Sequence, residues 1–468
     1  MLTQPLEVHQ PDSGQEMTQA VQLDDLPYQR DSCELFERIR DMPGAALLDS
    51  SFPHSTAGRY DILAAAPIDR LPTLPEDAGE AQARAFFQNL SDYHHEHYAG
   101  IQPVSQDIPF CGGILGYIGY DCGNNLENVH RDAQQPGALP QIQLQAYNWC
   151  VVQDHLLRRA TLVCQPGVSG ATHRDLLGRL RQPSRQHPAN FKLGTKFHSN
   201  FTANEYKQAF DRIKGYIRAG DCYQVNLAQR FSAAYAGDPW FAYKALRPVA
   251  AASFSAYLAL EGDSAIISLS PERFLSLHGH HVETAPIKGT RPRHKDAAAD
   301  RRAARELRAS EKDRAENLMI VDLLRNDLGR SCVPGSIHVD RLFEVQSLAT
   351  VHHLVSTISG ELSADRGAAQ LLRDSFPGGS ITGAPKRRAM QIIAELEPDP
   401  RQVYCGSLVY ISADGRMDSN IAIRTLQCSE AEIHCWAGGG IVADSHWEQE
   451  YQETWDKVGK FLETIEQL

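Results

Sequence analysis

The chain has 468 residues, 42% of them hydrophobic and 22% charged, which is an ordinary composition for a folded chain that buries a large core. Its 46 basic residues against 58 acidic ones give a formal charge of −12, which argues against a dominant nucleic-acid or anionic-membrane surface. Because the start resembles no signal peptide, no apolar run approaches the ~20 residues of a membrane span and the ten cysteines form no CxxC pair, we expect a cytoplasmic protein with reduced thiols.

Short strands dominate the first part of the chain. Apolar segments separated by Gly, Pro and Ser predict strands within residues 45–50 and 60–67. The glycines of residues 110–123 favour strands with closely packed backbones. Residues 142–164 fit a hairpin that turns near Gln153.

The composition divides the chain into two regions. Residues 1 to about 30 are polar and aperiodic, which indicates a loosely ordered lead. Residues 165–197 are basic, dotted with Pro and Gly and only weakly helical. We therefore predict an N-terminal region over 1–165, a linker over 166–198 and a second region over 199–468.

Strands and helices alternate more clearly in the second region. Thr202 and Glu205 form a capping-box pattern, followed by helical spacing that stops at Gly220, and residues 222–232 alternate as a strand does. Residues 298–330 are mainly helical, with an interruption near Ser310. Further along, the pattern predicts a helix from Pro385 to about Glu397, strands near 404–412, 420–428 and 432–437, the glycine run 438–440 and a final helix over 446–467. So many hairpin strands with interspersed helices indicate an α+β fold.

Two acidic pairs are candidates for a metal site. Asp313 and Glu316 share one helix face, as do Glu450 and Glu453 in the last helix. Each pair alone is typical of a solvated helix face. If the two pairs met, their oxygens would suit a hard cation such as Mg²⁺, but spacing does not decide whether they meet.

A single framed lysine is the other unusual feature. In ETAPIKGTRPR (283–293), Lys288 stands between Pro286 and Gly289, so its backbone is restricted on one side and free on the other. A solvated turn is the plain alternative. Similarly, FPGGSITGAPK (376–386) ends at a predicted helix start whose amides are suited to an anion, but the same residues also fit an ordinary turn.

These stretches together resemble a known family. The following segments resemble, in this order, the motifs of chorismate-utilising enzymes: SPERF (270–274), PIKGTRPR (286–293), AENLMIVDLLRNDLGR (315–330), FPGGSITGAPK, SNIAIRT (419–425) and AGGGIVADSHWEQEYQET (437–454). The likeness covers about residues 195–465, and 47–67 and 112–121 resemble the family's N-terminal region. It implies two large, mostly antiparallel sheets packed as a sandwich with helices outside.

Two positions suggest which branch of the family the chain resembles. Isochorismate and salicylate synthases carry a lysine base where this chain has Gln224, and a glutamine takes no proton from water near neutral pH. Anthranilate synthases have a small residue where this chain has Lys288. The combination resembles the branch that forms aminodeoxychorismate with a lysine nucleophile. Anthranilate synthase component I and a non-catalytic chorismate-binding protein remain the alternatives.

The resemblance also implies roles for individual residues. Glu272 corresponds to the general acid and Lys288 to the nucleophile, with the lysine pKa lowered by burial or by cations such as Arg291, Arg293 and the metal. The implied cofactor is Mg²⁺, held directly by Glu316 and Glu453 and through water by Asp313 and Glu450. The implied substrate contacts are Tyr404, Arg424, Lys457, His353, Ser380, Gln224 and the backbone amides of Gly438 and Gly440.

The source of nitrogen is expected to lie outside the chain. No GxCxG nucleophile elbow is present, so ammonia is expected from solution or from a glutamine amidotransferase small subunit, which the family supplies separately. LLDSS (47–51) resembles the tryptophan-pocket signature of anthranilate enzymes, and the sequence leaves open whether tryptophan binds.

Overall fold

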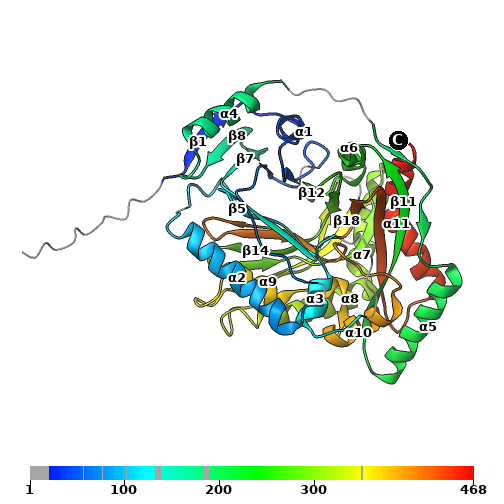
Figure 1. The fold of residues 1–468 in the computed structure, drawn as a ribbon. Helices are drawn as coiled ribbons and strands as arrows, with labels where there is room; N and C mark the ends of the chain where they lie inside the picture. Colours follow the sequence, from blue (N-terminus) through cyan, green and yellow to red (C-terminus); the bar gives the residue numbers. More distant parts are fainter. Residues whose placement is uncertain are drawn as a thin grey trace, which may run out of the picture.

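The computed structural model describes residues 20–55, 57–75, 77–101, 103–131, 139–183, 190–348 and 351–468. Within these residues the chain folds into two large antiparallel sheets with helices on their outer sides, which confirms the predicted α+β sandwich (Figure 1). Side chains of one sheet, such as Ile62 and Ile266, share a hydrophobic core with side chains of the other, such as Leu115 and Val409. No helix of the described part is long and apolar enough to cross a membrane.

The larger sheet has thirteen strands and contains elements from both ends of the chain. Its main path is β1 (Gln22–Leu26), β8 (Arg159–Cys164), β7 (Trp149–Asp154), β3 (Tyr60–Ala64), β2 (Ala46–Asp49), β12 (Phe254–Ala259), β13 (Ala265–Ser270), β22 (Thr425–Ser429), β23 (Glu432–Ile441), β11 (Gln224–Ala236) and β10 (His198–Ser199). β19 (Gly383–Ala384) and β9 (Lys192–Leu193) pair with β11.

The second sheet has ten strands. Its path is β16 (Ile287–Pro292), β18 (Val351–Glu361), β15 (His281–Thr284), β14 (Arg273–His278), β21 (Met417–Asn420), β20 (Ser407–Ser412), β5 (Gly113–Ile118), β6 (Ile142–Tyr147) and β4 (Asp69–Arg70), and β17 (His338–Ser347) pairs with β18. Because β2 pairs with β12 and β5 pairs with β20, the N-terminal and second regions share both sheets. The predicted boundaries, with an N-terminal region, a linker and a second region, remain a prediction from composition.

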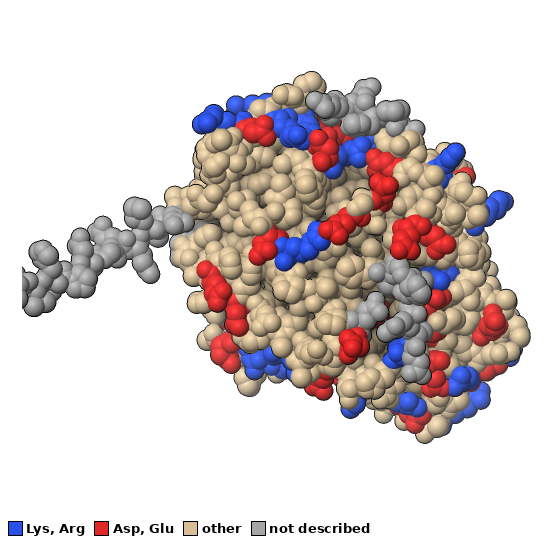
Figure 2. All heavy atoms as spheres, viewed as in Figure 1, with Lys and Arg blue, Asp and Glu red and all other residues tan. Residues whose placement is uncertain are grey.

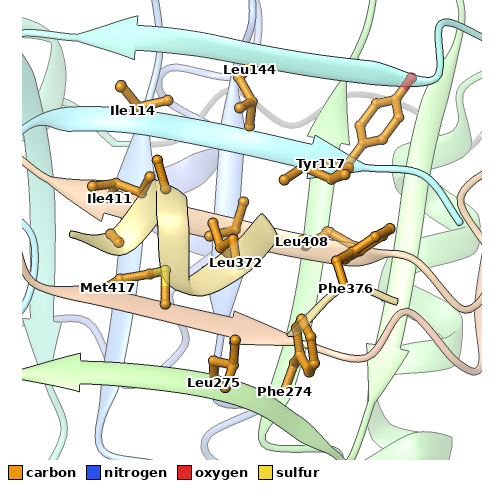
Figure 3. Packing of buried hydrophobic residues seen from close by; sticks show 14 of the residues in the cluster. Ile114, Tyr117, Leu144, Phe274, Leu275, Leu372, Phe376, Leu408, Ile411 and Met417 are labelled. Atoms are coloured by element: carbon orange, nitrogen blue, oxygen red, sulfur yellow. The ribbon is translucent and has the colours of Figure 1, made fainter. Parts of the chain in front are cut away.

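Helices cover the outer faces of both sheets. They are α1 (Cys33–Phe36), α2 (Glu80–Tyr98), α3 (Asp121–Leu126), α4 (Gly170–Arg181), α5 (Ala203–Ala219), α6 (Pro239–Ala250), α7 (Ala297–Ala309), α8 (Glu311–Leu328), α9 (Ala368–Ser375), α10 (Lys386–Leu396) and α11 (Trp447–Glu466), with a short 3₁₀ turn at Gly379–Ile381. Figure 3 shows Leu372 of α9 lying over the second sheet, above Leu408, Met417 and Leu275. α6 and α11 pack on the larger sheet through a second core. On the face in Figure 2, acidic and basic residues are interspersed.

Several local predictions are confirmed. Thr202 and Glu205 form the predicted capping box of α5, and Gly220 ends that helix in the left-handed conformation that glycine adopts easily. The Ser310 hydroxyl accepts from the amide of Asp313, so this residue caps α8 at the predicted interruption between α7 and α8.

Other local predictions were wrong. Residues 142–164 form three strands rather than one hairpin: the chain changes sheet at Asn148, and the true turn joins β7 to β8 across 155–158. Residues 22–26 of the expected loose lead form β1 on the edge of the larger sheet, while residues 1–19 lie outside the described part. Helix α4 lies within the expected linker, in agreement with the weakly helical pattern predicted there, and residues 184–189 of that segment are outside the described part.

Candidate active site

All the predicted catalytic residues, metal ligands and substrate contacts line one cavity of about 910 Å³. The two predicted catalytic residues are Glu272 and Lys288, and the predicted metal ligands are Asp313, Glu316, Glu450 and Glu453. The predicted substrate contacts are Gln224, His353, Ser380, Tyr404, Arg424, Gly438, Gly440 and Lys457. These residues are spread over more than 230 positions of sequence, so the fold alone brings them together.

The chain crosses between the two sheets at two points of this cavity. Glu272 lies between β13 of the larger sheet and β14 of the second sheet. Arg424 lies between β21 of the second sheet and β22 of the larger sheet, with a left-handed φ of 50°. The amide of Ile421 donates to the carbonyl of Glu272 at 3.0 Å, which joins the two crossings. Both side chains are therefore held where the sheets meet.

Lys288 lies on β16 at a bulge, where the register against β18 shifts between Lys288 and Thr290. Its Nζ donates to the carbonyl oxygen of Ser380 at 3.0 Å. Burial lowers the pKa of Lys288, and the Lys457 ammonium contributes in the same direction against the opposing charge of Glu272. A lowered pKa leaves more of this amine neutral, and therefore nucleophilic, near neutral pH.

The arginines expected to lower this pKa have other partners. Arg291 donates to the Asp313 carboxylate at 3.0 Å, and Arg293 forms an ion pair with Asp300 at 2.9 Å. Their charges are largely neutralised by these acids. Burial, which was predicted, is the main cause that lowers the pKa of Lys288, and Lys457 takes the place of the two arginines as the contributing cation.

Glu272 is buried, with 6% of its surface exposed. Burial raises the pKa of Glu272, while Lys288 and a hydrogen bond from Ser380 partly oppose the rise. A raised pKa favours the protonated form, which a general acid needs before it can donate a proton.

One end of the cavity is suited to an anion. Burial lowers the pKa of Arg424, and among the described residues no acidic side chain forms an ion pair with its guanidinium. His353 is also buried, and burial together with Arg424 lowers its pKa to about 4, so the imidazole is neutral at pH 7. Tyr404 is stacked on Trp436, with ring centroids 6.2 Å apart, and forms an aromatic wall. An unpaired guanidinium fork with a neutral neighbour suits a carboxylate.

Glycines of β23 make room for side chains from β11 and α11. A Cβ at Gly440 would lie 2.5 Å from Nε2 of Gln224, so this glycine leaves space for the glutamine side chain. The Oε1 atom of Gln224 is buried and has no hydrogen-bond partner among the described residues. The carbonyl of Gly438 accepts from Lys457 Nζ at 2.8 Å. The glycine run lies inside β23, not after a strand as predicted.

The four predicted metal ligands line the same cavity but have protein partners in this structure. Glu453 forms an ion pair with Lys457 at 2.7 Å and Glu316 a longer one with Lys312 at 3.9 Å, Asp313 is bonded to Arg291, and Glu450 accepts from the Ser445 hydroxyl. Consistent with these partners, no group of three or more His, Cys, Asp or Glu side chains in the described ranges is arranged to hold a metal ion.

The charges of these carboxylates nevertheless suit a cation. Burial raises the pKa of Glu316, and the nearby charges of Asp313 and Glu450 raise it further. Burial raises the pKa of Glu450 too, with Glu453 adding to the rise. Glu453 differs, because Lys457 outweighs its burial and lowers its pKa. Carboxylates that repel one another in one cavity are a donor set that fits a hard divalent ion.

Sequence reasoning missed Gly439. A Cβ at this position would lie 3.0 Å from Oε2 of Glu450 and 3.7 Å from Oε1 of Glu453, so the glycine lets β23 approach both carboxylates. The run of three glycines was the available signal, but only its outer members were interpreted. Lys386, the last residue of the FPGGSITGAPK segment, is buried and forms an ion pair with Asp327 at 2.8 Å.

Gly289 is expected to be intolerant of substitution. Its φ is +73°, and a Cβ there would lie 2.9 Å from the Asp313 carboxylate and 2.8 Å from Cδ1 of Leu307. We expect Gly289→Ala to lower the free energy of unfolding by roughly 1–3 kcal/mol through strain and crowding. Gly279→Ala is the matched control, because Gly279 has a similar φ of +62° but open space around it. Urea denaturation would measure the free energy of unfolding of both variants. Equal decreases would show that crowding against Asp313 adds nothing to the cost of the backbone strain.

The family model for the chorismate binding enzyme matches residues 48–463, nearly the whole described chain. The chain therefore belongs to the chorismate binding enzyme family.

The chain is also similar over most of its length to individual proteins of this family. Aminodeoxychorismate synthase component 1 of Salmonella typhimurium is 45% identical over 448 residues, covering 94% of this chain and 97% of that protein. Anthranilate synthase component 1 of Streptomyces coelicolor is 39% identical over 382 residues, covering 78% and 75%. Among solved structures, anthranilate synthase component I from Streptococcus pneumoniae TIGR4 aligns with a TM-score of 0.76 at 30% identity, covering 87% of this chain and 93% of that one.

Proposed function

We propose that the protein converts chorismate and ammonia to 4-amino-4-deoxychorismate through a covalent intermediate on Lys288, as a step toward 4-aminobenzoate and folate. The observation that carries this proposal is the lysine amine, with a lowered pKa, in one cavity with the buried Glu272 carboxyl. The high identity to aminodeoxychorismate synthase component 1 over nearly the full length of both chains supports it.

Substrate binding follows from the charges of the cavity. Chorismate carries two carboxylates, and the cavity offers the Arg424 guanidinium at one end, the Lys457 ammonium beside the glycine run and four carboxylates for a bridging cation. The Tyr404 and Trp436 rings supply apolar surface for the substrate. A divalent cation is required in this proposal because the carboxylates of the cavity would otherwise repel those of the substrate.

The first chemical step uses both predicted catalytic residues. The neutral Lys288 amine attacks C2 of the ring and forms an N–C2 bond, the two ring double bonds shift, and the C4–O bond breaks. Glu272 gives its proton to the departing hydroxyl, which leaves as water. The hydroxyl alone is a poor leaving group, so a positioned acid with a raised pKa lowers this barrier.

Ammonia completes the reaction in a second step. It attacks C4, the double bonds return, and the C2–N bond breaks to release the neutral Lys288 amine, while a proton from the new C4 ammonium restores the Glu272 carboxyl. The balance is chorismate plus ammonia giving aminodeoxychorismate plus water, with no oxidation. Two allylic displacements replace one difficult substitution, which is the usual gain from covalent catalysis. Gln224 lines the cavity and is unable to act as a base that would activate water instead.

The proposed cofactor is Mg²⁺, with Glu316 and Glu453 as direct ligands and Asp313 and Glu450 acting through water. When bound, the ion would supply positive charge for the ring carboxylate. The Glu453 and Asp313 carboxylates, now paired with Lys457 and Arg291, would then have the metal ion as their positive partner instead.

The isolated chain is expected to use ammonium salts but not glutamine, because it carries no glutaminase nucleophile elbow. We propose that a glutamine amidotransferase small subunit supplies ammonia in the cell. The measurement is product formation from chorismate and Mg²⁺ with either nitrogen source. Glutamine-dependent turnover by rigorously purified chain, unchanged by an enzymatic ammonia trap, would overturn this part of the proposal.

The lowered pKa of Lys288 can be tested without turnover. An amine reacts with acetylating reagents only when neutral, so its reactivity rises as pH rises through its pKa. We expect Lys288 to reach half-maximal labelling at a lower pH than the lysine of an unfolded peptide with the sequence 283–293. Peptide mass spectrometry would follow both. Identical midpoints would show that the fold does not activate this amine.

A further inference from the structure

We propose that Arg401 is a positioning residue that fixes three walls of the active-site cavity from behind. This inference rests on the proposed function for its meaning in catalysis. Arg401 does not line the cavity and is fully buried, with 0% of its surface exposed. Yet its guanidinium contacts segments that each carry a candidate site residue.

The first two walls are held by hydrogen bonds to the backbone. Nη1 of Arg401 donates to the carbonyl of Ile381 at 2.9 Å, next to Ser380, whose own carbonyl accepts from Lys288. Nη2 donates to the carbonyl of Asn226 at 3.0 Å, on the strand that carries Gln224. One guanidinium therefore joins the Ser380 turn to β11.

The third wall is the Tyr404 segment. The Arg401 guanidinium lies 5.8 Å from the centre of the Tyr404 ring and 4.7 Å from that of Tyr120. The amide of Tyr404 donates to the Arg401 carbonyl at 2.9 Å. On either side of Tyr404, the non-glycine residues Gln402 and Cys405 have left-handed φ values of 52° and 63°. Such a backbone persists only when its surroundings fix it.

Glu397 orients the guanidinium. It accepts from Nε and Nη2 of Arg401 at 2.9 and 2.7 Å, and its Oε1 also accepts from the amide of Ala228 on β11 at 2.8 Å. The planar fork of arginine makes all these bonds at once, whereas a lysine ammonium has three donors and no fixed plane. Arg401→Lys should therefore keep the buried charge balanced but lose the geometry.

The variant Arg401→Lys tests this inference against Arg416→Lys. Arg416 is also buried and paired to a carboxylate, Asp414, and donates to the carbonyl of Ser105, but it lies at the far end of the β20–β21 hairpin. We expect Arg401→Lys to lower kcat by roughly tenfold or more with a smaller change in KM, because a small misplacement of reacting groups slows the chemical step. Arg416→Lys should leave kcat unchanged.

A second measurement separates positioning from general damage and does not need turnover. If the Ser380 turn moves, Lys288 loses a carbonyl that stabilises its protonated form, so its labelling midpoint should fall further in Arg401→Lys and not in Arg416→Lys. The other charged groups that influence Lys288, namely Glu272, Lys457, Glu316 and Glu453, are identical in all these proteins.

The outcomes are distinct. A folded Arg401→Lys protein with wild-type kcat and wild-type labelling would overturn the inference. If Arg401→Lys does not fold, the variant Glu397→Gln takes its place in the test. The neutral glutamine holds the Arg401 guanidinium less firmly, so kcat and the Lys288 labelling midpoint should both fall, but less than expected for Arg401→Lys. If the wild type makes no aminodeoxychorismate, the proposed function fails, while the labelling comparison still tests Arg401.

Discussion

Replacing Lys288 with alanine is expected to reduce aminodeoxychorismate formation by about a hundredfold or more, on the scale of losing a positioned catalytic group. Ammonia would then have no covalent route to C4. Glu272, Arg424 and the acidic residues remain in the cavity, so chorismate should still bind. With the lysine side chain gone, ammonia gains access to C2, and some 2-amino product and anthranilate are expected.

Arginine at this position serves as the matched variant. Lys288→Arg keeps a positive charge in the cavity, but a guanidinium is never neutral at working pH and should be even less active than alanine. Steady-state rates with product analysis by mass spectrometry would measure both variants. Wild-type rates from Lys288→Ala would make the lysine a charged binding residue and rule out the covalent route.

Substitutions of the four proposed metal ligands are expected to differ in effect between the proposed direct ligands and the proposed water-mediated ones. Glu316→Gln and Glu453→Gln should lose most activity, and Asp313→Asn and Glu450→Gln should lose about 10- to 100-fold, as outer ligands typically do. The readouts are turnover and Mg²⁺ affinity by calorimetry. Undiminished turnover of Glu316→Gln at limiting Mg²⁺ would remove it from the ligand set.

Without a metal ion, Glu316→Gln and Glu453→Gln are expected to change the melting temperature differently. Burial and neighbouring carboxylates raise the pKa of Glu316, so its charge is unfavourable without a cation, and Glu316→Gln should keep or raise the melting temperature. Glu453 is paired with Lys457, which lowers its pKa, so Glu453→Gln should lower the melting temperature. Thermal unfolding in EDTA would distinguish the two. Identical shifts would contradict the charge arrangement described here.

Local signals in the sequence predicted much of the second region. The capping box at Thr202 and the left-handed Gly220 fix the ends of α5 through contacts within a few residues. Sheet membership is different, because it depends on pairing between distant strands. Apolar residues stand on both sides of Asn148, and this local pattern does not indicate that β6 and β7 enter different sheets.

The candidate site shows the same division. Ordered motifs identified the residues that line the cavity, and the two i,i+3 acidic pairs were visible from spacing. The partner of Arg291 and the charge of Lys457 near Lys288 depend on three-dimensional contacts, so burial was predicted correctly as a cause of the lysine pKa shift but the contributing cations were not. Arg401 carries no motif signal, because it acts from behind the cavity wall.

The central claim is most directly tested by the product that the purified chain makes from chorismate, Mg²⁺ and ammonium. Chromatography with mass spectrometry would identify the product, and a coupled assay would follow pyruvate. The account predicts 4-amino-4-deoxychorismate, which retains the enolpyruvyl group, and therefore no release of pyruvate. Anthranilate formed with an equal amount of pyruvate would identify an anthranilate synthase, and chorismate binding without any product would identify a non-catalytic protein; either result would contradict the account.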